Sequence, residues 1–135
     1  METIASGRRS FRRRAVQVEV SIQLKPPHSI ARSGVGSVLT LVGRTKNMSE
    51  NGMALVVSAN NIDRYLKQAE NAFEIKLKLP ANLVELQASP VYYKRYSSGG
   101  AVNYLIGARF INVGKQQHHV LIEFLRSLPP ATQTD

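Results

Sequence analysis

The sequence predicts a mainly β fold: a six-stranded antiparallel β-barrel with a C-terminal amphipathic α-helix and a flexible basic N-terminal arm. Apolar and polar residues alternate in residues 16–24 and 73–79, which is the period of a half-buried strand. Turn-forming residues separate six short apolar segments. Residues 115–128 instead repeat their apolar side chains with helical spacing, so this last segment is expected to be a helix with one buried face.

The first half of the chain is expected to supply three strands. The first covers residues 14–25 and ends at Pro26-Pro27, which is followed by a loop rich in Ser and Gly. Residues 37–42 and 53–58 are the next two apolar segments. Asn61 is then expected to cap a short helix that runs to Ala69, because apolar residues after it fall on one helical face.

The second half is expected to supply the other three strands. The strand at residues 73–79 ends at Pro80. Residues 83–96 and 103–113 are joined by Ser97-Ser98-Gly99-Gly100, whose glycines can adopt the positive φ angles of a hairpin turn. We therefore expect one domain: a flexible arm at residues 1–14, the barrel and helix at 15–128, and a tail at 129–135.

Composition excludes several classes of function. The 135 residues include no cysteine, which excludes disulfides, thiolate catalysis and zinc sites built on sulfur. The three histidines include one adjacent pair, His118-His119, whose side chains point to different sides of a helix. His28 stands apart from them, so neither a metal pair nor a catalytic triad is expected, and the chain is predicted not to be an enzyme.

Charge is concentrated in the first third of the chain. The net charge is +9, and residues 1–46 carry nine basic and two acidic residues. This excess favours an anionic partner. The Arg8-Arg9 pair resembles an export signal, but no apolar stretch follows it, and no segment has the length of a membrane span. We expect a cytoplasmic protein with no membrane insertion.

Two polar stretches are the candidate binding residues. Five arginines precede the first strand: Arg8, Arg9, Arg12, Arg13 and Arg14. The second stretch, Asn47-Met48-Ser49-Glu50-Asn51-Gly52, lies between two apolar segments. Alone, the first is compatible with a basic tail and the second with an ordinary Asn-Gly turn. Further basic candidates lie in the later strands and before the second stretch: Arg44, Lys46, Arg95 and Arg109.

Together the two stretches resemble the PilZ domain family, which pairs Arg-x-x-x-Arg with Asp/Asn-x-Ser-x-x-Gly. Asn47, Ser49 and Gly52 match the second motif. Arg9 and Arg13 are the preferred match to the first, and Arg8 and Arg12 satisfy the same spacing. Residues 104–110 resemble the family's late strand, Tyr-x-hydrophobic-Gly-hydrophobic-x-Phe, so the resemblance covers about residues 8–128.

The resemblance implies a receptor for the second messenger cyclic di-GMP, with no cofactor and no metal. Arginine suits such a ligand because its guanidinium forms bidentate hydrogen bonds with phosphate or guanine and also stacks on a purine ring. Asn47 and Ser49, on a turn that Gly52 permits, are expected to recognise a guanine edge. Ligand binding is expected to close the arm over the barrel and to recruit an effector protein, in control of motility, biofilm or virulence.

Two alternatives remain open from the residues. One is a PilZ-like adaptor that binds only proteins, against which the intact motifs argue. The other is a basic nucleic-acid-binding barrel; the low aromatic content of 7% disfavours it, and we interpret the cluster of Tyr92, Tyr93 and Tyr96 as structural. The protein is expected to be a monomer or a dimer.

Overall fold

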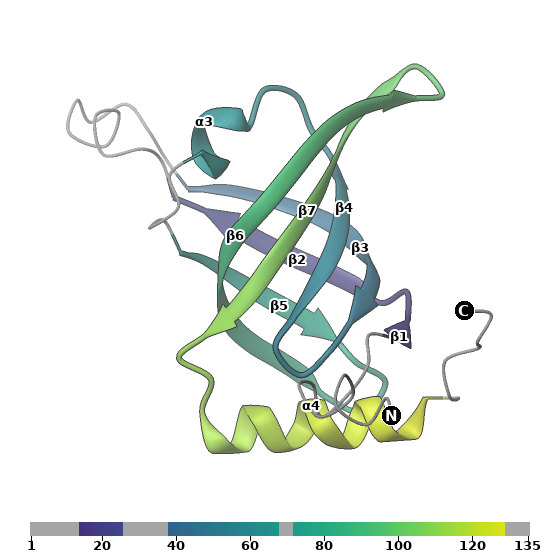
Figure 1. Ribbon diagram of the computed structural model, residues 1–135, viewed down its shortest axis with the longest axis vertical. Helices are drawn as coiled ribbons and strands as arrows, with labels where there is room; N and C mark the ends of the chain where they lie inside the picture. The colour runs from purple at the N-terminus through teal and green to yellow at the C-terminus, as the bar shows by residue number, and fades with distance from the viewer. Residues whose placement is uncertain (1–13, 26–37, 68–71, 129–135) are drawn as a thin grey trace, which may run out of the picture.

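The computed structural model describes residues 14–25, 38–67 and 72–128 (Figure 1). It is built mainly from strands. In chain order the elements are β1 (Arg14–Ala15), β2 (Glu19–Leu24), β3 (Leu39–Met48), β4 (Gly52–Ser58), α3 (Asp63–Leu66), β5 (Phe73–Lys78), β6 (Leu83–Ser98), β7 (Ala101–Ile111) and α4 (Lys115–Ser127).

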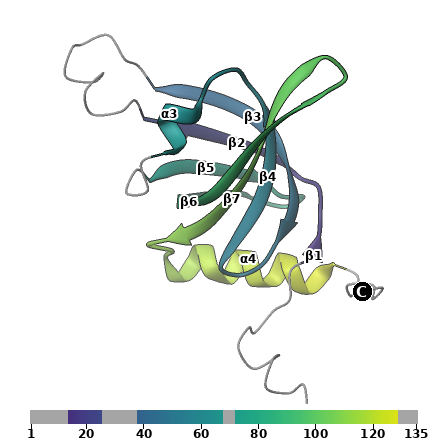
Figure 2. The same cartoon turned by 45° about the horizontal axis from the view of Figure 1, so that its top comes forward.

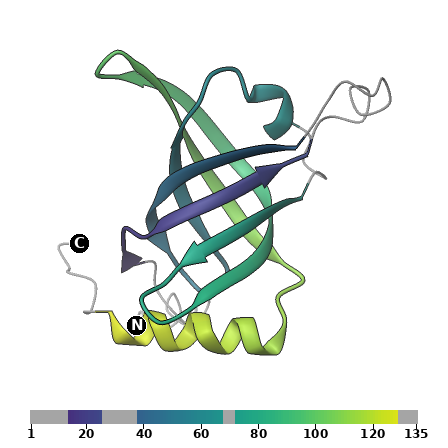
Figure 3. The same cartoon turned by 180° about the vertical axis from the view of Figure 1, so that it is seen from behind.

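The strands form the predicted barrel. Their order is β1-β3-β2-β5-β6-β7-β4, and an additional pairing of β3 with β4 closes the six long strands into a ring. Every pairing is antiparallel. The two-residue β1 pairs with the end of β3. Helix α4 lies across one end of the barrel, as Figures 1 and 3 show, so the expected barrel and C-terminal helix are confirmed. The expected flexible arm lies, except for Arg14, outside the described residues.

The core follows the alternation seen in the sequence. The inward side chains of β2 and β5 are almost fully buried: Val20, Ile22, Leu24, Phe73, Ile75 and Leu77. Helix α4 adds Leu121 and Leu125, which are both fully buried at the end of the barrel. Burial of one such side chain stabilises the fold by about 1.5–3 kcal/mol, so this face of α4 fixes the helix firmly on the barrel.

The opposite end of the barrel holds α3 and the hairpin between β6 and β7 (Figures 1 and 2). The hairpin turn is made by Gly99 and Gly100, with φ angles of 61° and 81°. These positive values confirm the turn predicted from the two glycines. In the part of the chain that the structure describes, no helix is long and apolar enough to cross a membrane.

Most strand ends differ from the sequence prediction by one or two residues, and three differences are larger. The first strand is divided into β1 and β2 by residues 16–18. Strand β3 continues to Met48, through a polar stretch that has no strand alternation. The predicted helix from Asn61 is wrong in its start, because Ile62 occupies the N-cap position and Asn61 has a left-handed φ of 52°. Its predicted end at Ala69 lies outside the described residues.

Candidate functional site

The pairing of β1 with β3 places the end of the basic stretch beside the second motif. Arg14 pairs with Met48, and Ala15 pairs with Asn47. The last arginine of the basic stretch is therefore on the strand next to the Asn47 motif. The predicted ligand-binding arginines Arg8, Arg9, Arg12 and Arg13 lie outside the described residues.

Thr45 holds the chain between β1 and β2 against β3. Its side chain is 1% exposed, and its hydroxyl donates to the Val16 carbonyl at 2.5 Å and accepts from the Val18 N–H at 3.0 Å. The Thr45 N–H donates to the Val18 carbonyl at 3.0 Å, and the Val16 N–H donates to the Lys46 carbonyl at 3.3 Å. The sequence analysis missed Thr45, because one threonine in a polar stretch carries no distinctive signal.

A β-bulge determines which residues of β3 face outwards. The pairing with β4 shifts register between Thr45 and Asn47, so that Lys46 is the extra residue. Thr45 and Met48 are both buried, although they are three residues apart. Without the bulge, residues three apart on a strand would face opposite sides. Lys46 is exposed and Asn47 is partly exposed, so the bulge directs the predicted ligand-binding amide to the outer surface.

The turn from β3 to β4 is held by its own hydrogen bonds. The Ser49 N–H donates to the Gly52 carbonyl at 2.9 Å, and the Ser49 hydroxyl accepts from the Asn51 N–H at 3.2 Å. The Asn51 carbonyl in turn accepts from the Phe110 N–H of β7 at 2.8 Å. Ser49 is only 5% exposed. Its hydroxyl therefore shapes the turn, and direct contact with a ligand stays a prediction.

Gly52 is needed for a different reason from the one expected. Positive φ angles among the described glycines occur at Gly99 and Gly100, not at Gly52. A Cβ atom on Gly52 would instead lie 2.2 Å from the Ala108 carbonyl oxygen of β7. The absence of a side chain thus lets β4 approach β7 closely. Within the same turn, the Glu50 Oε1 atom lies 3.7 Å from His118 Nε2, and this contact connects the motif to α4.

Strand register extends the site across the outer face of the barrel. Asn47 pairs with Ala54, Ala54 with Gly107, and Gly107 with Tyr92, so these four residues form one cross-strand row. Directly paired residues face the same side of a sheet. A Cβ on Gly107 would be 2.2 Å from the Tyr92 ring, so the ring lies against this glycine. Tyr92 is nevertheless 47% exposed, which leaves part of its ring open to solvent.

The tyrosine cluster therefore has more than one role. Tyr93 packs against the fully buried Tyr104, with 6.2 Å between ring centroids, as a structural interpretation requires. Tyr92 belongs to the outer row that includes Asn47. Tyr92 and Tyr93 are consecutive residues of β6 and therefore point to opposite sides of the sheet, a difference that grouping the tyrosines by their position in the sequence overlooks.

The further basic candidates divide between the two ends of the barrel. Lys46 precedes Asn47, and Arg109 pairs with Gly52, so both lie beside the motif, and both are exposed. Arg44 is exposed on β3 and pairs with Glu19 of β2. Arg95 lines a cavity next to α3, at the far end of the barrel. The structure thus brings Lys46 and Arg109, but not Arg95, to the motif.

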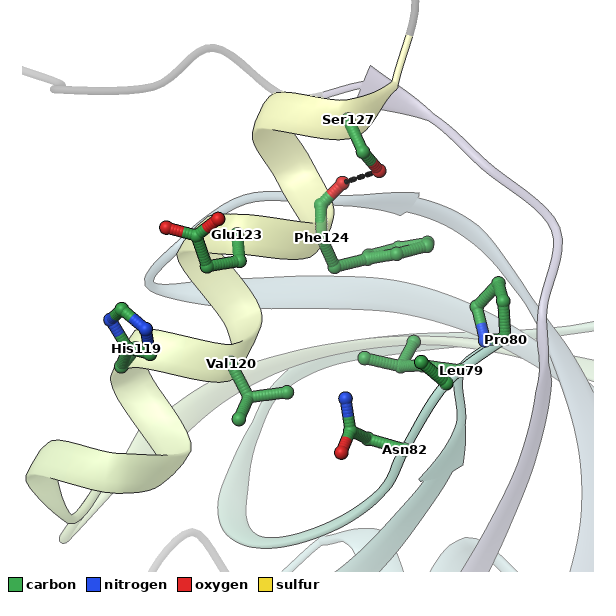
Figure 4. Close-up of a pocket in the computed structure, with 9 residues that line it drawn as sticks. Leu79, Pro80, Asn82, His119, Val120, Glu123, Phe124 and Ser127 are labelled. Carbon is green, nitrogen blue, oxygen red and sulfur yellow. Dashed lines mark hydrogen bonds between the residues drawn. The ribbon is translucent and has the colours of Figure 1, made fainter.

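A groove beside α4 has a different character. It has a volume of about 380 Å³. Figure 4 shows Val120 and Phe124 pointing towards Leu79 and Pro80, with His119 and Glu123 on the outer side of the helix. None of the described residues that line it is Lys or Arg. In the described residues, no group of three His, Asp or Glu side chains is placed to hold a metal ion.

Residues 7–127 match the family model of the PilZ domain. The chain belongs to the PilZ domain family. The match covers most of the chain, including both motifs and the strands that carry the outer row. A comparison with curated protein sequences gave no match.

Solved structures share this PilZ fold. The PilZ domain of YcgR from Escherichia coli with c-di-GMP matches at 18% identity and a TM-score of 0.61, over 90% of this chain and 91% of that one. PlzA from Borreliella burgdorferi, in complex with c-di-GMP, matches at 12% identity and a TM-score of 0.59, over 97% of this chain and 58% of that one. The apo MrkH of K. pneumonia matches at 13% identity and a TM-score of 0.58, over 86% of this chain and 50% of that one. This chain thus spans little more than half of PlzA and half of MrkH.

Proposed function

We propose that this PilZ domain is a cyclic di-GMP receptor and that the ligand binds between the arginine stretch before β1 and the outer face of β3, β4 and β7. The observation that supports this most directly is the pairing of Ala15 with Asn47. Ala15, which follows the arginine stretch directly, thus lies on the strand next to Asn47, although the two residues are far apart in the sequence. The structures of PlzA and YcgR contain c-di-GMP and share the fold.

The arginines supply the charge and the geometry for this ligand. Arg13 directly precedes Arg14 in the sequence, and consecutive Cα atoms are about 3.8 Å apart. Arg13 is therefore the residue directly before β1, the strand that lies beside Asn47. Guanidinium groups form bidentate hydrogen bonds with phosphate or with guanine O6 and N7. Arg9 and Arg13 are the proposed pair, with Arg8 and Arg12 as the alternative at the same spacing.

The barrel face supplies the base recognition. The Asn47 amide carries both a donor and an acceptor, which suits the mixed edge of guanine. Ser49 and Gly52 fix the turn that presents it, through the hydrogen bonds of Ser49 and the close approach of Gly52 to β7. The exposed ring of Tyr92 offers a surface on which a purine stacks, which is worth about 1–3 kcal/mol per base.

The signal passes to a partner protein in this proposal. Neutralised arginines allow residues 1–14 to close over the barrel, and an effector that binds the closed form better than the open form is then recruited. A solved structure with the same fold has the name Inhibitor of motility, from Bacillus subtilis, with 14% identity and a TM-score of 0.59 over 88% of this chain and 49% of that one. Control of motility is therefore the first pathway to examine.

Isothermal titration with cyclic di-GMP tests the proposal. The Arg13→Ala variant is expected to lose about 1.5–3 kcal/mol of binding, the range for hydrogen bonds to charged groups. Arg64→Ala removes an exposed arginine at the other end of the barrel and is the matched control. The same titration on Arg9→Ala, Arg8→Ala and Arg12→Ala identifies the pair that binds.

The same instrument separates the alternatives. Wild-type affinity in Arg13→Ala would disprove the arginine clamp. No heat with cyclic di-GMP for the intact chain would favour the protein-binding adaptor. Binding of a random oligonucleotide, steeply dependent on salt and without preference for cyclic di-GMP over GTP, would favour the nucleic-acid-binding barrel.

A further inference from the structure

The end of the barrel opposite α4 contains a polar cleft that the cyclic di-GMP proposal does not use. It consists of two cavities of about 650 and 630 Å³, which adjoin because Asn61 and Arg95 line both. The cleft lies between α3 and the hairpin of β6 and β7, which stand on the same end of the barrel in Figure 1. Its remaining lining residues are Asn60, Asp63, Arg64, Tyr65, Lys67, Tyr96, Ser97 and Val102.

The charge of the cleft is positive. Its lining includes three cations, Arg64, Lys67 and Arg95, and one carboxylate, that of Asp63. The Asp63 carboxylate is engaged by the fold, because it accepts a hydrogen bond from the Tyr104 hydroxyl. This hydrogen bond is the main cause of a lowered pKa of Asp63; burial opposes it, and the charge of Arg95 adds to it to a lesser extent. Two or more of the three cations therefore have no carboxylate of the cleft to neutralise them.

Among the described residues, the part of β6 that borders the cleft has a strand neighbour on one edge only. Strand β5 pairs with β6 only as far as Ala88. From Tyr92 to Ser98, β6 pairs with β7 alone among the described strands. Half of the N–H and C=O groups in such a strand point away from its single neighbour. An open strand edge of this kind is a template for pairing with another extended chain.

We propose that this cleft binds an extended acidic segment of a partner protein, which pairs with the open edge of β6 and places its carboxylates beside Arg64, Lys67 and Arg95. The cations match the charge of such a segment, and the strand edge matches its backbone. A nucleic acid would use the cations but has no peptide groups to pair with β6. The open edge therefore favours a peptide.

The cleft is separate from the proposed nucleotide site. The Asn47 turn lies at the α4 end, where Glu50 contacts His118, whereas Arg95 and α3 lie at the other end. The proposal does not depend on cyclic di-GMP binding. The variants that test it are expected to keep their affinity for cyclic di-GMP, so the two proposals can fail independently.

Fluorescence anisotropy of the full chain with a labelled peptide of alternating glutamate and threonine tests the proposal. The double variant Arg64→Glu/Lys67→Glu is expected to bind the peptide about tenfold more weakly or worse, which is about 1.4 kcal/mol. Lys76→Glu/Lys78→Glu makes the same charge change on exposed residues of β5 and is expected to bind as the wild type does. Methylation of alternate backbone nitrogens in the peptide is expected to abolish binding, because it blocks strand pairing.

Four results would overturn the proposal. The first is no binding of the acidic peptide to the wild type at millimolar concentration. The second is equal binding by the wild type and the Arg64→Glu/Lys67→Glu variant. The third is undiminished binding of the methylated peptide. The fourth is a single-stranded oligonucleotide that binds more tightly than the peptide and displaces it, which would assign the cleft to nucleic acid.

Discussion

At each end of the barrel, one buried hydroxyl group holds a neighbouring segment in place. At the α4 end, the buried hydroxyl of Thr45 holds residues 16–18 against β3. At the other end, the buried hydroxyl of Tyr104 holds α3, since it accepts from the Ile62 N–H at 3.2 Å and donates to Asp63. In both cases one hydroxyl inside the barrel fixes a segment that is not part of the barrel.

The charged groups differ between the two ends. At the α4 end, the proposed arginines belong to the segment that leads into β1, so recognition depends on where that segment is placed. At the α3 end, Arg64 lies on α3, Lys67 follows directly after it, and Arg95 lies on β6. Loss of the hydroxyl should therefore affect ligand binding at the first end and mainly the stability of the fold at the second.

The largest expected effect is that of Gly52→Ala at the α4 end. The new Cβ would lie 2.2 Å from a backbone oxygen of β7, and backbone cannot move aside as a flexible side chain does. We expect the free energy of unfolding in urea to fall by about 3 kcal/mol, the upper part of the range for overpacked sites. An unfolding midpoint equal to that of the wild type would contradict the close approach.

Gly43→Ala is the control for this variant. Its Cβ would lie 2.1 Å from the Val56 carbonyl oxygen, so a similar loss of stability is expected. Gly43 lies on β3 but outside the Asn47 turn. Only Gly52→Ala should also weaken cyclic di-GMP binding by the folded protein.

The next effect is that of Tyr104→Phe at the α3 end. The variant removes the donor to Asp63 and the acceptor for Ile62, and we expect the free energy of unfolding at pH 7 to fall by about 1.5–3 kcal/mol. The lowered pKa of folded Asp63 means that this stabilisation is complete above the ordinary carboxyl pKa. It is lost as the pH falls through the lowered folded pKa.

Urea unfolding of wild type and Tyr104→Phe across acid pH measures this prediction. The difference in the free energy of unfolding between the two proteins should shrink in that acid range. A difference that stays constant would show that the Tyr104 hydroxyl does not stabilise the ionised Asp63 carboxylate. The affinity for cyclic di-GMP should not change.

The smallest expected effect on stability is that of Thr45→Val. The replacement keeps the shape of the side chain but leaves the Val18 N–H without its acceptor, which costs about 1–2 kcal/mol. Because residues 16–18 are then held less firmly, we also expect the Kd for cyclic di-GMP to rise by roughly tenfold, or about 1.4 kcal/mol. Calorimetry on both variants compares the two ends directly. Equal weakening of ligand binding by Tyr104→Phe and Thr45→Val would remove the distinction between them.

The sequence predicted the elements whose pattern is set by burial on one face. The alternation in β2 and β5 and the helical spacing of α4 each follow from a single buried surface. The turn glycines Gly99 and Gly100 were also predicted correctly, because positive φ is a local requirement. The PilZ fold was predicted, and the motif residue Asn47 was found next to β1.

The remaining features depend on contacts between distant segments. The sequence at the end of β3 is polar and shows no strand alternation, because a bulge turns the residues near Asn47 outwards. This bulge is visible only in the pairing of β3 with β4. Residue 52 has to be glycine because β7, more than fifty residues later in the sequence, approaches its backbone closely. Thr45 and Tyr92 gain their roles from strand register, which sequence spacing alone does not determine.

The extra residue at Lys46 has a consequence for how this domain changes over evolutionary time. Because Thr45 and Met48 remain inside on either side of it, the identity of residue 47 is uncoupled from the hydrophobic interior. An exchange of amide for carboxylate at Asn47 would alter the outer surface and leave the core unchanged. Ligand preference and folding can therefore diversify along separate routes in the same strand.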